Sequence, residues 1–137
     1  MTKVIIVDDD IDILTMLEND IKGSLGYEVL AFTDPINAFA EIVSSTADID
    51  AIITDERMPN STGLQLLSAA VEFGFMGHMF IFSGYTDDSM SFELLKVEMQ
   101  RLKTKSKSCA VAKPSTKKLL GILKDAIEDK FVTEDEL

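Results

Sequence analysis

The chain has 137 residues, 46% of them hydrophobic and 27% charged, a composition that fits one globular domain of ordinary polarity. Apolar runs of only four or five residues exclude a membrane span, and the N-terminus lacks the apolar core of a secretion signal. A net charge of −11 argues against direct nucleic-acid binding, and the lone Cys109 excludes an intramolecular disulfide, so we expect a reducing, cytoplasmic location.

Short apolar runs alternate with longer stretches of helical period along the chain. The runs, which we predict to be strands, are Val4–Val7, Val29–Phe32, Ala51–Thr54, Met79–Phe82 and Ala110–Ala112. The helical faces between and after them are Leu14, Leu17 and Ile21; Phe39 and Val43; Leu64, Leu67 and Val71; Phe92, Leu95, Met99 and Leu102; and Leu120, Leu123, Ile127 and Phe131. Five strands alternating with five helices predict an α/β domain built on a doubly wound, five-stranded parallel sheet.

Residues typical of helix ends support these boundaries. Asp34-Pro35 is a good helix start, with Asp as the N-cap and Pro in the first turn. Gly26, Gly74 and Gly77 follow helical stretches where the chain must reverse. We therefore expect one domain over residues 1–130, followed by an acidic tail at 131–137.

Chemically active side chains follow the apolar runs. Asp8 and Asp9 end the first run, Asp55 the third, Ser83 the fourth and Lys113 the fifth. In a doubly wound sheet, ligands bind beyond the carboxyl ends of the strands. If the runs are parallel strands, these side chains therefore gather at one edge.

Such a cluster of carboxylates needs a cation, because like charges at about 4 Å cost roughly 4 kcal/mol at an effective dielectric near 20. Oxygen ligands without His or Cys favour Mg²⁺ or Mn²⁺ over zinc. Lys113 and the Ser83 hydroxyl suit an anion that shares the site with the metal, and Asp55 can act as a nucleophile towards phosphorus. The residues thus predict a phosphoryl-transfer site.

Neighbouring residues have simpler interpretations. We expect Asp10 to be a helix N-cap and Asp12 a solvated acid of the first helical turn. Glu56 is expected to face solvent, and His78 to lie in an exposed loop without partners. Cys109 is interpreted as a small hydrophobe at the start of a buried strand.

With these residues placed, the sequence resembles the receiver domain of bacterial two-component response regulators, in particular stand-alone regulators like those of chemotaxis. The resemblance runs from Lys3 to about Asp129. It rests on the ordered stretches Val4–Asp10, Ala51–Pro59, Thr62–Leu64, Phe80–Gly84 and Val111–Ser115.

The resemblance implies a flavodoxin-like strand order 2-1-3-4-5 and a phosphoacceptor at Asp55. It assigns the metal to Asp8, Asp9, Asp55 and the backbone carbonyl of Arg57. A domain of this kind is not an enzyme in its own right, but it assists its own phosphorylation and dephosphorylation. Its expected partners are a histidine kinase or phosphotransfer protein and an unidentified downstream protein, with a weak homodimer as a further expectation.

The resemblance also assigns the remaining residues around the acceptor. Ser83 would bind the phosphoryl group and move on activation, and Lys113 would pair with phosphoryl oxygens. Pro114 would follow a cis peptide bond. Arg57 and Tyr85 would flank the pocket and tune the phosphoryl lifetime.

Two departures from the family pattern affect the switch. Ala110 stands where the family usually has an aromatic residue, and the segment from Ser83 to Lys113 is several residues longer than usual. Most of the basic residues lie between Lys96 and Lys118, and this run is either a solvated helix end and loop or a docking surface. We hypothesise signalling through a modified fourth-helix face.

Two alternatives remain open at this point. One is a receiver-like interaction module that does not cycle phosphate. The other is a haloacid-dehalogenase-type phosphatase with Asp8 as nucleophile and Asp10 as its partner, a reading that leaves Asp55 without a role.

Overall fold

The structure, a computed structural model, describes residues 1–84, 90–102, 107–113 and 115–128. Over these residues five strands and five α-helices alternate, with one short 3₁₀ helix. The strands are β1 (Lys3–Val7), β2 (Glu28–Phe32), β3 (Ala51–Thr54), β4 (His78–Ser83) and β5 (Ser108–Ala112). The helices are α1 (Ile11–Leu25), α2 (Pro35–Ser44), α3 (Gly63–Glu72), α4 (Met90–Arg101), α5 (Thr116–Ile127) and the 3₁₀ helix η1 (Thr46–Asp48). Among the described helices, none combines the length and the hydropathy needed to cross a bilayer.

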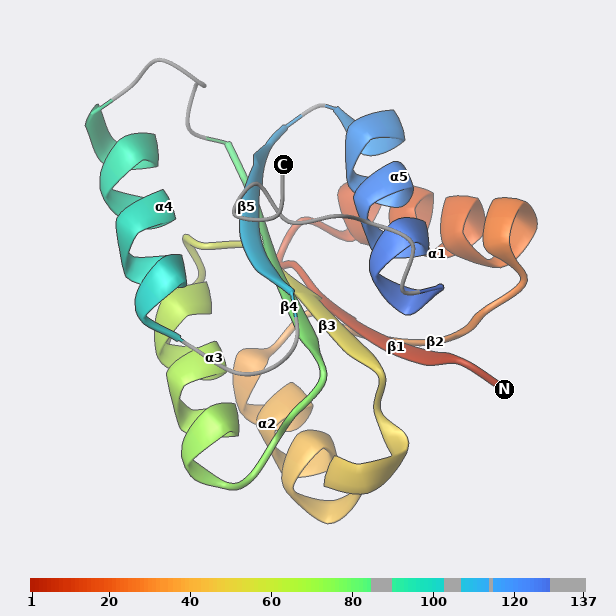
Figure 1. Ribbon diagram of the computed structural model, residues 1–137, viewed down its shortest axis with the longest axis horizontal. Helices are drawn as coiled ribbons and strands as arrows, with labels where there is room; N and C mark the ends of the chain where they lie inside the picture. Colours follow the sequence, from red (N-terminus) through yellow and green to blue (C-terminus); the bar gives the residue numbers. More distant parts are fainter. Residues whose placement is uncertain (85–89, 103–106, 114, 129–137) are drawn as a thin grey trace.

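The strands form one parallel sheet in the order β2-β1-β3-β4-β5, which confirms the predicted doubly wound topology (Figure 1). The register pairs Val7 with Thr54 and Ser83 with Ala112. Because these residues are the last of their strands, the polar residues that follow emerge at the same edge of the sheet.

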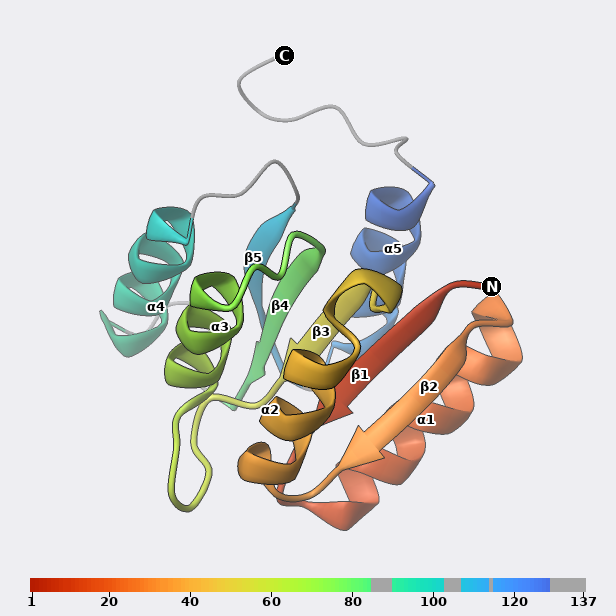
Figure 2. The same ribbon diagram turned by 90° about the horizontal axis from the view of Figure 1, so that it is seen from below.

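Helices cover both faces of the sheet (Figures 1 and 2). Helices α1 and α5 pack on one face, where they bury Val4, Ile6 and Ile53 of the strands. Helices α2, α3 and α4 pack on the other face, over Ile5 and Ile52. Burial on both faces explains why the strands read as continuous apolar runs rather than as alternating patterns.

The predicted helix starts are confirmed. Asp10 caps α1, because its Oδ1 accepts hydrogen bonds from the backbone N–H groups of Asp12 and Ile13. Asp34 caps α2 in the same way, and Pro35 lies in its first turn. Gly26 ends α1 with φ of 72°, a left-handed conformation that favours glycine.

The predicted core face of α2 is confirmed only in part, because Phe39 packs against the core whereas Val43 does not. The buried side chains are Ala38 and Ile42, whereas Phe39 is half-buried and Val43 is 40% exposed. Ala38 and Ile42 face the sheet, and Val43 is left on the outer side of the helix. The predicted faces of α1 and α4 are confirmed at Leu14, Leu17 and Ile21 and at Phe92, Leu95 and Met99.

Candidate functional site

The residues predicted for the site lie at the carboxyl ends of four neighbouring strands, β1, β3, β4 and β5. Asp8 follows β1, Asp55 follows β3, and the backbone N–H of Asp55 donates to the carbonyl of Val7 at 2.8 Å. Lys113 follows β5, and its backbone N–H donates to the carbonyl of Ser83 at 2.6 Å. Strand pairing therefore continues into the site and fixes where each side chain begins.

Three carboxylates converge at this edge. Asp8, Asp9 and Asp55 each offer one carboxylate oxygen, and these oxygens lie within 4.8 Å of one another. Asp8 is 2% exposed, Asp55 is half-buried and Asp9 is exposed. A compact set of carboxylate oxygens, open to solvent on the side of Asp9, fits the preference of Mg²⁺ for oxygen ligands and retained waters.

Lys113 reaches into the same cluster. Its Nζ donates to Oδ2 of Asp8 at 2.9 Å and lies 3.4 Å from Oδ1 of Asp55. The lysine side chain is only 15% exposed, so these ion pairs are shielded from solvent more than surface pairs are. One ammonium group thus faces two carboxylates.

The pKa values of Asp55 and Lys113 reflect this excess of negative charge. Burial, followed by the charge of Asp8, raises the pKa of Asp55, and Lys113 and the backbone N–H of Glu56 offset this only in part. Burial alone would lower the pKa of Lys113, but its hydrogen bond to Asp8 and the charges of Asp55 and Asp8 raise it above its ordinary value. Lys113 is therefore held in its charged form beside the Asp55 carboxylate.

Ser83 and Arg57 border the cluster in different ways. Ser83, the last residue of β4, is 1% exposed, and its carbonyl accepts the hydrogen bond from the backbone N–H of Lys113. Arg57 lies in the loop after β3, and its side chain is exposed. The roles of the Ser83 hydroxyl and the Arg57 carbonyl stay predictions, and Tyr85 and Pro114 lie outside the described residues.

The expectation that Glu56 faces solvent is wrong. Its Oε1 accepts a hydrogen bond from the backbone N–H of Leu64 at 2.9 Å, in the first turn of α3. Burial raises the pKa of Glu56, and the hydrogen bond from Leu64 partly offsets this effect. Glu56 therefore ties the loop after Asp55 to α3. No pattern in the sequence marks this contact, because the two residues are eight positions apart with an irregular loop between them.

Gly63 lets α3 lie close to the backbone of Asp55 at the end of β3. Thr62 caps α3 through a capping box with Gln65. A Cβ atom on Gly63 would overlap the backbone carbonyl of Asp55. The Thr62-Gly63 pair thus lets the helix start directly against the backbone of Asp55.

His78 is not the exposed, partnerless loop residue that the sequence predicted. It begins β4, and its Nδ1 accepts a hydrogen bond from the backbone N–H of Lys107 at 3.0 Å. Cys109 lies in β5 as predicted and is half-buried.

Comparison with known proteins agrees with this geometry. The family model of the response regulator receiver domain matches residues 4–113. No curated protein matches the chain. The structure of chemotaxis protein CheY4 from Vibrio cholerae is similar with a TM-score of 0.74 and 26% identity, covering 92% of this chain and 98% of that chain.

Two further solved structures share the fold. A CheY-like receiver domain protein from Methanospirillum hungatei has a TM-score of 0.77 at 21% identity, over 95% of this chain and 96% of that one. A CheX–CheY–BeF3–Mg²⁺ complex from Borrelia burgdorferi matches with a TM-score of 0.74 at 22% identity, over 96% of this chain and 90% of that chain.

These findings leave the phosphatase alternative without support. Asp10, which that alternative needs beside Asp8 as a catalytic partner, is exposed and caps α1 instead. The family match spans most of the sequence and includes every residue predicted for the site. The chain therefore belongs to the response regulator receiver domain family.

Proposed function

We propose that Asp55 accepts a phosphoryl group in a two-component phosphorelay, with a divalent cation bound beside it. The single observation that carries the proposal is the convergence of three carboxylates and the Lys113 ammonium at the carboxyl edge of the sheet. A cluster with this charge suits a cation and, next to it, the oxygens of a phosphoryl group.

The proposed transfer is an in-line displacement at phosphorus. A carboxylate oxygen of Asp55 forms a new P–O bond while the P–N bond of a phosphohistidine on the donor breaks. The electron pair of the broken P–N bond stays on the imidazole nitrogen. That nitrogen then takes up a proton if the other ring nitrogen carries none. Receiver domains act with histidine kinases or phosphotransfer proteins, and either would supply the phosphohistidine.

The chain's own residues would neutralise and orient the transferred group. Lys113 would turn from Asp8 towards a phosphoryl oxygen, and the Ser83 hydroxyl would donate to another. Asp8, Asp9, Asp55 and the Arg57 carbonyl would hold Mg²⁺ or Mn²⁺, which would lower the charge repulsion between the phosphoryl oxygens and the carboxylates. The Borrelia burgdorferi complex was solved with Mg²⁺, which supports this choice of metal.

The proposed output is a change of surface, because receiver domains are signalling domains rather than enzymes that turn over a substrate. Helix α4 presents a stripe of exposed apolar side chains, Met90, Leu94 and Val97. We propose that this stripe contacts a downstream protein. Ala110 is half-buried in β5 behind α4, so the switch would work without an aromatic ring at that position. Structures with and without a phosphoryl mimic test this: an unchanged α4 would reject it.

The location and extent of the domain belong to the same proposal. We propose that the chain acts in the cytoplasm, where a kinase that uses ATP would reach it. The receiver domain would span residues 1–130, and the acidic tail at 131–137 lies outside the described residues. A weak homodimer stays a prediction.

Incubation with a small-molecule phosphodonor and Mg²⁺, followed by intact mass measurement, tests the proposal. We expect a phosphoryl adduct that is labile to base, absent without the metal and absent in Asp55→Ala. Asp20→Ala, a change in α1 well away from the site in sequence, should behave like the parent protein. Failure of the folded parent protein to form any adduct would instead favour an interaction module that does not cycle phosphate.

A further inference from the structure

Helix α2 exposes apolar side chains where a surface helix usually carries polar ones. Ile36 is 60% exposed and Val43 is 40% exposed, and the exposed Ala40 lies between them on the same side of the helix. The polar residues Asn37 and Ser44 occupy a different side. The outer surface of α2 therefore has an apolar edge.

The end of α3 continues this apolar edge. Phe73, the C-cap residue of α3, is 59% exposed, and its ring meets that of Phe39 edge to face at 5.4 Å between centroids. Met76, three residues further on, is 67% exposed. Helices α2 and α3 lie side by side on the sheet (Figure 2). We define the α2–α3 face as Ile36, Phe39, Val43, Phe73 and Met76.

Exposed apolar side chains that stand alone need no explanation, but a connected group of them marks an interaction site. The Phe39–Phe73 contact connects the two helices into one such group. The group is separate from the exposed stripe of α4, which lies on a different helix. The chain thus has a second apolar surface that the proposed phosphoryl switch does not use.

The segment that forms the α2–α3 face is acidic, although the backbones of Lys3 and Lys107 contact Asp50 and His78, which line a nearby cavity. Between Thr33 and Gly77 the only basic residue is Arg57, which follows β3 at the opposite edge of the sheet. Asp48 and Glu72 are exposed at the ends of η1 and α3. A partner for this face should therefore combine apolar side chains with lysine or arginine.

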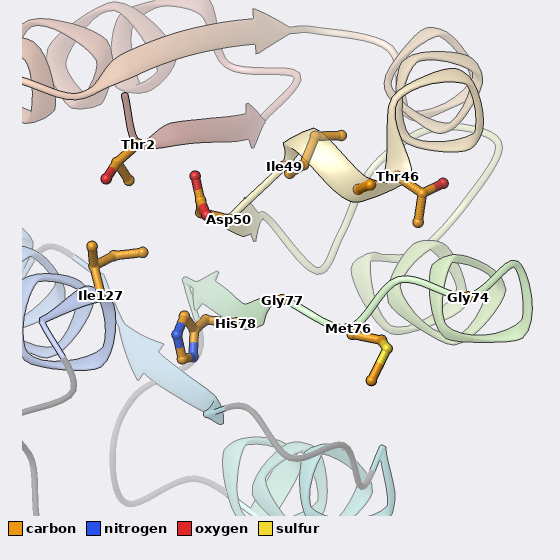
Figure 3. A pocket seen from close by; sticks show the side chains of 10 residues that line it. Thr2, Thr46, Ile49, Asp50, Gly74, Met76, Gly77, His78 and Ile127 are labelled. Atoms are coloured by element: carbon orange, nitrogen blue, oxygen red, sulfur yellow. The ribbon is translucent and has the colours of Figure 1, made fainter.

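A cavity of about 630 Å³ adjoins the face at the amino-terminal edge of the sheet (Figure 3). Met76 belongs both to the face and to the cavity lining, which also includes Ile49, Asp50 and Ile127. Oδ2 of Asp50 accepts a hydrogen bond from the backbone N–H of Lys3, and the residue is exposed. The cavity thus offers a positioned carboxylate beside apolar walls, which suits the long side chain of a lysine or arginine.

We propose that the α2–α3 face and its adjoining cavity dock a basic amphipathic segment of a partner protein. The segment's apolar side chains pack on Ile36, Phe73 and Met76. Its lysine or arginine side chains lie near Glu72 and reach Asp50 in the cavity. None of these residues belongs to the cluster of Asp8, Asp9 and Asp55. A two-fold dimer of this chain through the same face would bring its acidic rim against itself.

The experiment uses a synthetic amphipathic helical peptide of leucine and lysine as the probe, with a leucine–glutamate peptide of the same length as its matched control. The ¹⁵N-labelled chain is titrated with each peptide in the presence of Mg²⁺, which competes for the acidic cluster at Asp55. We expect the lysine peptide to shift amide signals of α2, η1 and the end of α3. The glutamate peptide should bind at least about tenfold more weakly.

Variants separate this face from general attraction to an acidic protein. Ile36→Ser combined with Met76→Ser should weaken binding at least about tenfold, whereas Met16→Ser on α1, at 39% exposure, should leave it unchanged. Asp50→Asn keeps an acceptor for the Lys3 N–H and removes the charge, so it should weaken binding without unfolding the chain. Circular dichroism confirms that each variant is folded.

Several outcomes would overturn the proposal. Equal binding of both peptides would show that charge plays no part. Shifts that map to α4 or to the acidic cluster would place the probe elsewhere, as would unchanged binding by the Ile36/Met76 double variant. Self-association of the parent chain that the double variant abolishes would assign the face to a second copy instead.

Discussion

Nζ of Lys113 lies 2.9 Å from Oδ2 of Asp8, although 105 residues separate the two along the chain. This ion pair links the residue after β1 to the residue after β5 at the carboxyl edge of the sheet. Asp8 is nearly fully buried, and its carboxylate oxygens accept hydrogen bonds from this partner and from the backbone N–H of Asp10. Lys113 is thus the counter-ion of Asp8, and a metal cation bound at the cluster would share that role.

Competition between Lys113 and a metal gives the first prediction. Lys113→Ala removes a positive charge from beside Asp8 and Asp55, so Mg²⁺ should bind more tightly, by about tenfold or ~1.4 kcal/mol. Lys117→Ala, an exposed change in α5, is the matched control and should leave the affinity unchanged. Calorimetric titration of both variants measures the effect. Weaker Mg²⁺ binding by Lys113→Ala would contradict the account.

The raised pKa of Asp55 predicts a stability change on substitution. Burial and the charge of Asp8 raise this pKa above its ordinary 3.8, so the folded state holds a proton more firmly than the unfolded chain does. Stability therefore falls as the pH rises from near 3.8 through the folded-state pKa. Asp55→Asn removes this charge. Without metal at neutral pH, the variant should therefore be more stable than the parent protein.

Urea unfolding with and without Mg²⁺ tests this second prediction. The metal should stabilise the parent protein and have little effect on Asp55→Asn, because the variant lacks one of the three carboxylates. A variant that is less stable than the parent in metal-free buffer would show that the Asp55 charge does not destabilise the folded protein.

The close approach of α3 to the backbone of Asp55 gives the third prediction. In Gly63→Ala the new methyl group would overlap the Asp55 carbonyl, so the backbone must shift, at a cost of about 1–3 kcal/mol. Gly121→Ala is the matched control, because nothing lies within 4 Å of its added Cβ in helix α5. That change should stabilise the protein by roughly 0.5–1 kcal/mol. Similar effects of the two changes on urea unfolding would rule out the tight contact.

The fourth prediction concerns Cys109, the only cysteine in the sequence. Burial raises the pKa of its thiol from 9.0 to about 11, although Lys107 and Lys118 partly offset the shift. Because only the thiolate reacts, alkylation at pH 8 should be roughly 100-fold slower in the folded protein than in the unfolded chain. The rate in the folded protein should still rise with pH above 9. Equal rates with and without urea would contradict the buried placement.

The fold could be read from the sequence because its strands are buried on both faces. Runs such as Ala51–Thr54 are continuous and apolar, and the observed strands begin and end within two residues of the predicted ones. The polar residues after each run also identified the carboxyl edge, since a parallel sheet leaves no other place for them. The meeting of Asp8, Asp55 and Lys113 followed from topology.

Side-chain partners could not be read in this way. The hydrogen bond of His78 with Lys107 spans 29 residues, and that of Glu56 with Leu64 depends on the path of an irregular loop. The exposed side of α2 was also missed, because Phe39 and Val43 have the spacing of a core stripe. Only the packing of Ala38 against the sheet decides which of two apolar faces turns inward.

The most direct test of the central claim locates the phosphoryl group on one residue. After reaction with a small phosphodonor and Mg²⁺, borohydride reduction converts an aspartyl phosphate into homoserine, which peptide mass spectrometry can place in the sequence. The account predicts homoserine at Asp55 and at neither Asp8 nor Asp9. Homoserine at Asp8 or Asp9, with Asp55 unmodified, would contradict it.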